Sequence, residues 1–121
     1  MKIKKKIYRA ISLKQPWANL VASGEKTIET RKWTTNYRGD LVICSSKKPD
    51  IFPAGCALCV VELYDVRPMT KEHEKRACIK VYRGARSWFL RNLRPIGPPT
   101  PIKGSLGIFN LKLPKISGVR Y

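Results

Sequence analysis

Hydrophobic and polar residues alternate along several short stretches of the chain, which is the pattern of half-buried β-strands. The alternation predicts strands at residues 7–13, 27–33, 41–45, 57–65 and 106–113. Residues 87–94 also alternate, although their apolar positions fit helical spacing as well. Residues 95–101 hold four prolines and a glycine, and this composition predicts an extended loop.

Two stretches have the spacing of helices. Trp17, Leu20 and Val21 form one apolar face, and Gly24 suits the left-handed residue that follows a helix. A second helix is expected over residues 71–78, after a threonine that can act as its N-cap. Five or six strands with two helices predict a small α+β fold, either a mixed sheet or a barrel.

The chain of 121 residues is expected to form one domain. Its core should cover about residues 7–113, with a basic N-terminal arm at 1–6 and a loose tail at 114–121. No apolar stretch is long enough to cross a bilayer, and no apolar segment follows the basic start as in a secretory signal. We therefore expect a cytoplasmic protein without a membrane partner, and a monomer.

Charge is the unusual statistic. Twenty-five Lys and Arg residues against eight Asp and Glu residues give a formal net charge of +17. An excess of this size attracts polyanions and raises their encounter rate. RNA or single-stranded nucleic acid is the first expected partner and an acidic protein the second, although solubility alone would also account for the charge.

The cysteines allow a zinc interpretation but do not favour it. Cys56 and Cys59 have CxxC spacing, yet they lie within an expected strand, where a separation of three places them on opposite faces. No second CxxC follows. We expect no metal and no cofactor, and interpret Cys44, Cys56, Cys59 and Cys78 as buried free thiols.

The most informative segment runs from Ile11 to Trp33. After the first helix, alternation places Thr27, Glu29, Arg31 and Trp33 on one face of a strand, with Lys26 at the bend before it. A lysine beside a carboxylate can bind a phosphate or carbonyl, or can act as a base if burial lowers its pKa. An exposed, ion-paired strand explains the same residues equally well.

Glu62 and His73 are two further candidates for a functional site. Glu62 stands within an apolar run, so it lies either on the wet face of a strand or beside a buried basic partner, for which Arg31 is a candidate. His73, the only histidine, lies among charged residues and is expected at the surface rather than in a catalytic site.

Aromatic residues interleaved with basic ones suggest nucleic-acid binding, because aromatic faces stack on unpaired bases while basic groups hold phosphates. Trp17 lies on the apolar face of its helix and is expected in the core. Trp33 and Trp88 are the better candidates for stacking.

The run ISLKQPWANLVASGEKTIETRKW, followed by YRGDLVICSSK, resembles the ASCH domain family, which is named for homology to the activating signal cointegrator. The later run WFLRNLRPIGPPTPIKGSLGIFNL resembles the end of the same domain, so the likeness covers about residues 8–113. It implies a PUA-like β-barrel with two or three flanking helices. It also implies a ligand cleft beside the barrel, lined here by Gly24, Lys26, Thr27, Glu29, Arg31, Ser45, Ser46 and Lys47.

One branch of this superfamily removes the acetyl group from acetylated cytidine, and the present chain resembles it at Lys26 and Arg31. That branch has a threonine nucleophile three residues after the lysine, where this chain has Glu29. A carboxylate cannot replace an activated hydroxyl that attacks an amide. Glu72 and Glu74 lie in the general region of the branch's catalytic glutamate.

Three functions follow as hypotheses. The first is a module that binds RNA, single-stranded nucleic acid or a nucleotide-like ligand, with Trp33, Glu62 and Trp88 added to the cleft residues. The second is a hydrolase acting on a modified nucleoside or on RNA, with Lys26 and Glu29 as its acid–base pair. The third is a coregulator-type adaptor that binds an acidic protein.

Overall fold

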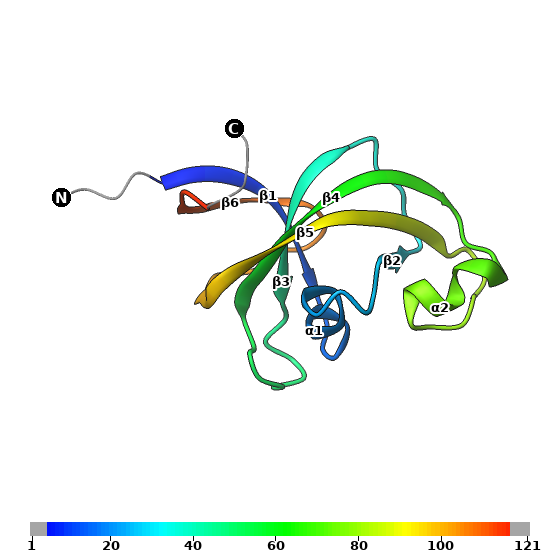
Figure 1. Cartoon of the computed structure of the whole chain (residues 1–121), viewed down its shortest axis with the longest axis horizontal. Coiled ribbons are helices and arrows are strands. Elements are labelled where there is room, and N and C mark those ends of the chain that lie inside the picture. Colours follow the sequence, from blue (N-terminus) through cyan, green and yellow to red (C-terminus); the bar gives the residue numbers. More distant parts are fainter. Residues whose placement is uncertain (1–4, 117–121) are drawn as a thin grey trace.

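Six strands form one mixed sheet in this computed structural model, which describes residues 5–116 (Figure 1). Their hydrogen-bonded order is β2-β5-β4-β3-β1-β6, and only β1 and β3 run parallel to one another. The strands are β1 (Lys5–Leu13), β2 (Ile28–Arg31), β3 (Gly39–Ser45), β4 (Cys56–Pro68), β5 (Arg86–Pro101) and β6 (Phe109–Pro114). The predicted small α+β fold is confirmed.

The helices are short, and they fall where spacing placed them. The first is α1 (Trp17–Ala22), which buries Ala18 and Val21 and is followed by Gly24 at a φ of +86°. The second expected helix is a 3-10 turn, η1 (Lys71–His73), followed by one α-helical turn, α2 (Glu74–Ala77). Neither is long and apolar enough to cross a membrane, and the same holds for every helix within residues 5–116.

The alternating stretch at 87–94 is a strand rather than a helix, and the predicted loop at 95–101 is wrong. Both belong to β5, whose second half pairs with β4, for example Ala57 with Thr100. Prolines lack the N–H that a central strand must donate. They are tolerated here because β2 covers only Arg86–Phe89, so this half of β5 has a free edge.

The closing strand is shorter than alternation predicted. It begins at Phe109 rather than at Leu106, whose side chain is 95% exposed. Gly107 turns the chain with a φ of +64°, so residues 102–108 form a loop before β6. Lys5 and Lys6 of the expected basic arm belong to β1, and the rest of the arm and residues 117–121 of the tail lie outside the described residues.

The sheet is strongly curved, and a side chain joins two of its distant strands. β2 stands at one end of the strand order, with β5, β4 and β3 between it and β1. Nevertheless, Arg31 on β2 donates from Nη2 to the backbone oxygen of Ser12 on β1, at 2.9 Å. The curvature therefore brings β2 back towards the end of β1, and this approach encloses the site described below.

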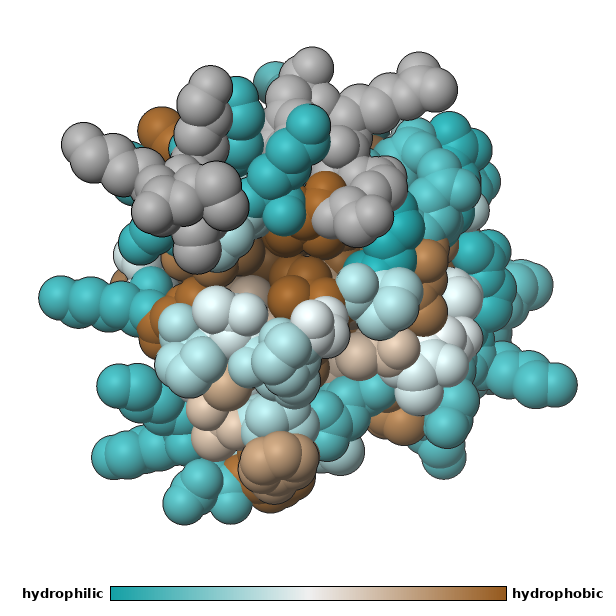
Figure 2. All heavy atoms as spheres, turned by 60° about the vertical axis from the view of Figure 1, so that its left-hand side comes forward, coloured by the Kyte–Doolittle hydropathy of each residue, from teal (hydrophilic) through white to brown (hydrophobic). Residues whose placement is uncertain are grey.

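Apolar side chains fill the core, and most charged side chains lie at the surface, with Lys26 and Glu29 as buried exceptions. One core cluster packs α1 against the sheet through residues such as Val21, Leu63 and Trp88, and another joins β1 to β6. Figure 2 shows one face on which hydrophilic side chains project around the periphery, while hydrophobic atoms gather in a central hollow. Most of the cationic side chains among the described residues are therefore exposed to solvent.

Candidate functional site

A cavity of about 780 Å³ opens where the ends of β1 and β3 face β2. The parallel register sets Leu13 beside Ser45, so the segments that leave these two strands emerge together. The cavity is lined by Ser12, Leu13, Lys14, Trp17, Lys26, Glu29, Thr30, Arg31, Ser45, Ser46, Lys47, Gly55, Ile79, Tyr82 and residues 102–107. This volume is in the range of small-molecule and cofactor sites.

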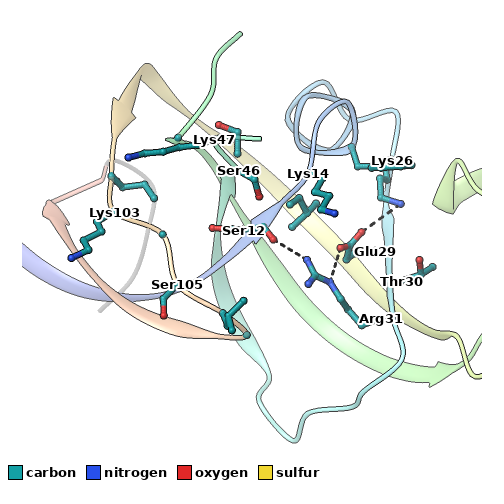
Figure 3. A pocket seen from close by; sticks show the side chains of 18 of the residues that line it. Ser12, Lys14, Lys26, Glu29, Thr30, Arg31, Ser46, Lys47, Lys103 and Ser105 are labelled. Atoms are coloured by element: carbon teal, nitrogen blue, oxygen red, sulfur yellow. Dashed lines mark hydrogen bonds and ion pairs between the residues drawn. The ribbon is translucent and has the colours of Figure 1, made fainter. Parts of the chain in front are cut away.

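Lys26, Glu29 and Arg31 form a triad on one wall of the cavity (Figure 3). Glu29 receives a hydrogen bond from Arg31 Nε at 2.9 Å, and its other oxygen lies 3.6 Å from Lys26 Nζ. The side chains of Lys26 and Glu29 are only 1% and 11% exposed. Because both carboxylate oxygens already face cations, Glu29 serves first to hold two cationic groups at this wall.

Lys26 is the least ordinary member of the triad. Its ammonium also donates to the backbone oxygen of Ala77, at the end of α2. Burial lowers the pKa of Lys26 below 10.5, because a charged ammonium loses solvation there, while the nearby Glu29 carboxylate opposes the shift. The residue can therefore release and regain a proton more readily than a surface lysine.

Three more cationic side chains line the cavity, and Glu29 is the only acidic residue among the described residues of its lining. Lys14, Lys47 and Lys103 are exposed, and none makes an ion pair with a described residue. In Figure 3, Lys47 and Lys103 lie on the other side of the cavity from the triad. The site thus carries five cationic side chains and one carboxylate, which is a field that favours an anion.

The remaining lining is hydroxyl-bearing and apolar. Ser46 and Ser105 add hydroxyl groups near the lysines, and the Tyr82 hydroxyl donates to Thr30 Oγ1 at 3.1 Å. Trp17 is half-buried and lines the cavity. The lining therefore combines exposed cationic and hydroxyl groups with apolar side chains.

Six of the predicted site residues meet in this cavity. They are Lys26, Glu29, Arg31, Ser45, Ser46 and Lys47. Thr27 does not line it, because its hydroxyl accepts a hydrogen bond from Arg76 Nε at 2.9 Å on the side of α2. Gly24 ends α1 outside the cavity lining.

Glu62 is placed elsewhere, and its expected partner was wrong. Its carboxylate binds Arg91 Nη2 at 2.8 Å and Asn92 Nδ2 at 2.6 Å, on the hydrogen-bonded pair of β4 and β5. Arg91 and Asn92 hold the pKa of Glu62 below its usual range. Arg31 is not the partner of Glu62, because β2 pairs with β5 and not with β4 within residues 5–116.

The assignment of the tryptophans also changes. Trp88 is fully buried in the core, so its faces are closed to a base and its predicted stacking role is wrong. Trp33 is 39% exposed and meets Trp88 edge to face at 4.8 Å between ring centroids. Trp17, expected in the core, is half-buried: it packs against the core cluster and also lines the cavity.

Sequence reasoning missed Ser12, Thr30, Tyr82 and the loop at 102–107 as parts of the site. Thr30 was assigned to the opposite strand face from Glu29, but β2 is only four residues long and ends beside the cavity. Alternation extended the closing strand back over residues 106–108 of this loop, and residues 102–105 carried no predicted role. Its composition, with Gly104 and Gly107 around a lone leucine, was the available signal for a loop.

The other titratable groups lie outside the cavity. Glu72 is exposed, and a hydrogen bond from Thr70 lowers its pKa, while Glu74 accepts from the Val81 N–H at 2.8 Å. His73 is half-buried rather than a surface residue, with Nδ1 2.9 Å from Ser87 Oγ. None of these three side chains faces the triad's cavity.

The cysteines are free thiols in different environments. Cys44 and Cys59 are buried, and burial raises the pKa of each to about 12. Cys56 is half-buried and Cys78 exposed, so the expectation of buried thiols is wrong for Cys78. No group of three or more His, Cys, Asp or Glu residues between residues 5 and 116 is arranged to hold a metal ion.

Comparison with known proteins gives the family of this chain. Activating signal cointegrator 1 of Mus musculus and that of Homo sapiens are each 28% identical over 126 residues, which is 84% of this chain but 22% of each relative. Two solved structures from Zymomonas mobilis share the fold: an ASCH protein (TM-score 0.62, 18% identity, 78% of this chain and 73% of that chain) and its S128A mutant (TM-score 0.68, 16% identity, 85% and 87%). The family model of the ASCH domain matches residues 11–100, and the chain therefore belongs to the ASCH domain family.

Proposed function

We propose that this protein binds RNA or another single-stranded nucleic acid, or a nucleotide-like ligand, in the cavity beside β2. ASCH domains are a family proposed to bind RNA. The observation that carries the proposal for this chain is the lining of the cavity, where five cationic side chains surround a single carboxylate that is already paired.

The two sides of the cavity suit different parts of a nucleotide. Lys47 and Lys103, with the hydroxyls of Ser46 and Ser105, suit a phosphate. Trp17 and the triad suit a base, because a ring can lie on the indole while Lys26 and Arg31 donate to its carbonyl oxygens. The net charge of +17 adds attraction that does not depend on sequence.

Fluorescence anisotropy with a labelled single-stranded oligoribonucleotide, measured over a salt series, tests this proposal. The logarithm of the affinity should fall linearly with the logarithm of the salt concentration, by about 0.7 for each phosphate contact on a single strand. The double variant Lys47→Ala/Lys103→Ala should bind more weakly and reduce this slope by about 1.4. A single-stranded DNA of the same sequence, measured in parallel, shows which nucleic acid is preferred.

A matched control removes the same charge elsewhere. Lys71 and Lys75 are exposed, and they lie on η1 and α2 outside the cavity lining. Lys71→Ala/Lys75→Ala should leave affinity and slope nearly unchanged. If both double variants lose affinity equally, the protein binds through its overall charge, and the cavity is not the binding site.

A hydrolase acting on a modified nucleoside or on RNA is the second candidate, and the buried Lys26 favours it. With its lowered pKa, Lys26 Nζ could pass a proton to or from a ligand while Glu29 lies 3.6 Å away. Incubation with acetylated cytidine, and with structured and unstructured RNA, should then give turnover that Lys26→Met and Glu29→Gln both abolish. Turnover that survives both substitutions would place the chemistry outside this triad.

A further inference from the structure

Phe52 is an aromatic side chain that the fold leaves almost entirely in solvent. It is 85% exposed, whereas the tryptophans of this chain are buried, half-buried or 39% exposed. It lies in the loop between β3 and β4, which in Figure 1 extends below the sheet beside α1. We propose that Phe52 is a stacking platform for the nucleotide next to the one held in the cavity, an inference that rests on the proposed function.

Two side chains anchor the backbone that carries this ring. Asn19 Nδ2 on α1 donates to the backbone oxygen of Phe52 at 3.1 Å, and Gln15 Nε2 donates to that of Pro53 at 3.2 Å. Gln15 is itself 2% exposed and is bonded to Asn19 through both ends of its amide, at 2.9 Å each. An aromatic side chain on an anchored backbone loses little entropy when a base stacks on it.

The same loop forms part of the cavity rim. Lys47 at its start and Gly55 at its end both line the cavity. Phe52 is three residues from Gly55, so the two Cα atoms are at most about 11 Å apart. The helix that anchors the loop also carries Trp17, which lines the cavity. A strand leaving the cavity past Lys47 therefore reaches Phe52 within one or two nucleotides.

Charge favours a nucleic acid over a protein surface at this position. Lys47 and Lys48 precede Phe52 in the loop, Lys14 lies at the rim beside α1, and Asp50 is the loop's one acidic residue. Cations beside an exposed flat ring are the combination that binds single strands, because phosphates and bases are satisfied together.

The test compares ligands of two lengths. A labelled oligoadenylate of about 12 nucleotides is long enough to occupy both places, whereas adenosine monophosphate can occupy only the cavity. Phe52→Ala should weaken binding of the oligoadenylate by roughly tenfold, which is within the effect of removing one stacked base, and should leave binding of the monophosphate unchanged. Because the ring is exposed and its backbone bonds remain, the variant should keep the wild-type thermal midpoint.

Three further variants separate stacking from simple hydrophobicity. Phe52→Trp keeps a flat ring and should preserve affinity, while Phe52→Leu keeps an apolar side chain and should lose it. Ile51, 40% exposed in the same loop, is the control, and Ile51→Ala should bind as the wild type does.

Different failures have different meanings. If Phe52→Ala binds the oligoadenylate as tightly as the wild type while Lys47→Ala/Lys103→Ala loses affinity, the cavity binds nucleic acid and the role of Phe52 is wrong. If the wild type binds neither ligand, the proposed function itself is overturned. If Phe52→Ala instead abolishes self-association in light scattering without changing oligoadenylate affinity, the ring serves a protein interface and the inference is overturned.

Discussion

Replacing Glu29 by Gln is the perturbation that most directly probes how the cavity wall is built. The substitution keeps the size of the side chain and one acceptor oxygen for Arg31, but it removes the negative charge. Lys26, whose side chain is 1% exposed, then has no counter-charge at 3.6 Å. Breaking a buried pair in this way is costly, because it leaves an uncompensated charge away from water.

The magnitude follows from the geometry of the pair. At an effective dielectric constant of about 20, two unit charges at 3.6 Å attract by about 5 kcal/mol. Two effects reduce the loss. Gln still accepts from Arg31, and Lys26 can escape part of the penalty by releasing its proton, since losing Glu29 lowers its pKa further. We expect Glu29→Gln to lower the free energy of unfolding by about 3 kcal/mol at neutral pH.

Urea denaturation followed by tryptophan fluorescence measures this change. With a slope of about 2 kcal/mol per molar urea, the midpoint should fall by about 1.5 M. In a Lys26→Met background, Glu29→Gln should cost at least about 1 kcal/mol less, because the buried ammonium is already gone. A loss below about 0.5 kcal/mol in the wild-type background would refute the view that Glu29 holds the two cations at this wall.

Three other predictions follow from the same contacts. Burial lowers the pKa of Lys26 in the folded state, so the unfolded chain holds that proton to higher pH. The free energy of unfolding of the wild type, relative to that of Lys26→Met, should therefore rise with pH just below 10.5. A difference that falls with pH in urea titrations would contradict this. With pKa values of about 12, Cys44 and Cys59 should resist maleimide at pH 7.5 while Cys78 is modified first, as mass spectrometry of digests would show; equal rates would contradict their burial. Gly55→Ala should lower the free energy of unfolding by about 1 kcal/mol in urea, because the φ of Gly55 is +65°. It should also weaken oligonucleotide binding, because the added Cβ would lie 3.0 Å from Lys47 Cγ. Gly84→Ala is the control: with a φ of +80° and nothing within 4 Å, it should cost similar stability without changing affinity.

Much of the fold could be predicted from alternation and spacing, because most strands bury one face. β1, β3 and β4 were located within a few residues of their ends, and Gly24 marked the end of α1 correctly. The errors occurred where the local sequence pattern and the pairing between strands favour different structures. Prolines argued for a loop at 95–101, but a free strand edge accepts them.

The site was predictable only in part, because it depends on which strands approach one another. The motif around Lys26, Glu29 and Arg31 lies on one wall of the cavity. Which side chains pair across strands depends on strand order and register, which the sequence does not show. Arg31 was therefore the predicted partner of Glu62, whereas Arg91 lies opposite Glu62 on β5 and binds it. Burial of a tryptophan is likewise a tertiary property, and alternation around Trp88 could not show that it belongs to the buried core cluster.

Binding of a single-stranded nucleic acid in the cavity beside β2 can be observed residue by residue. Titration of the isotope-labelled protein with a short oligoribonucleotide, followed by backbone amide NMR, is the measurement. We expect the largest shift changes on Lys14, residues 26–31, residues 45–47 and the loop at 102–107. Changes concentrated on β1 and β6 away from the cavity, or no changes at saturating oligonucleotide, would contradict it.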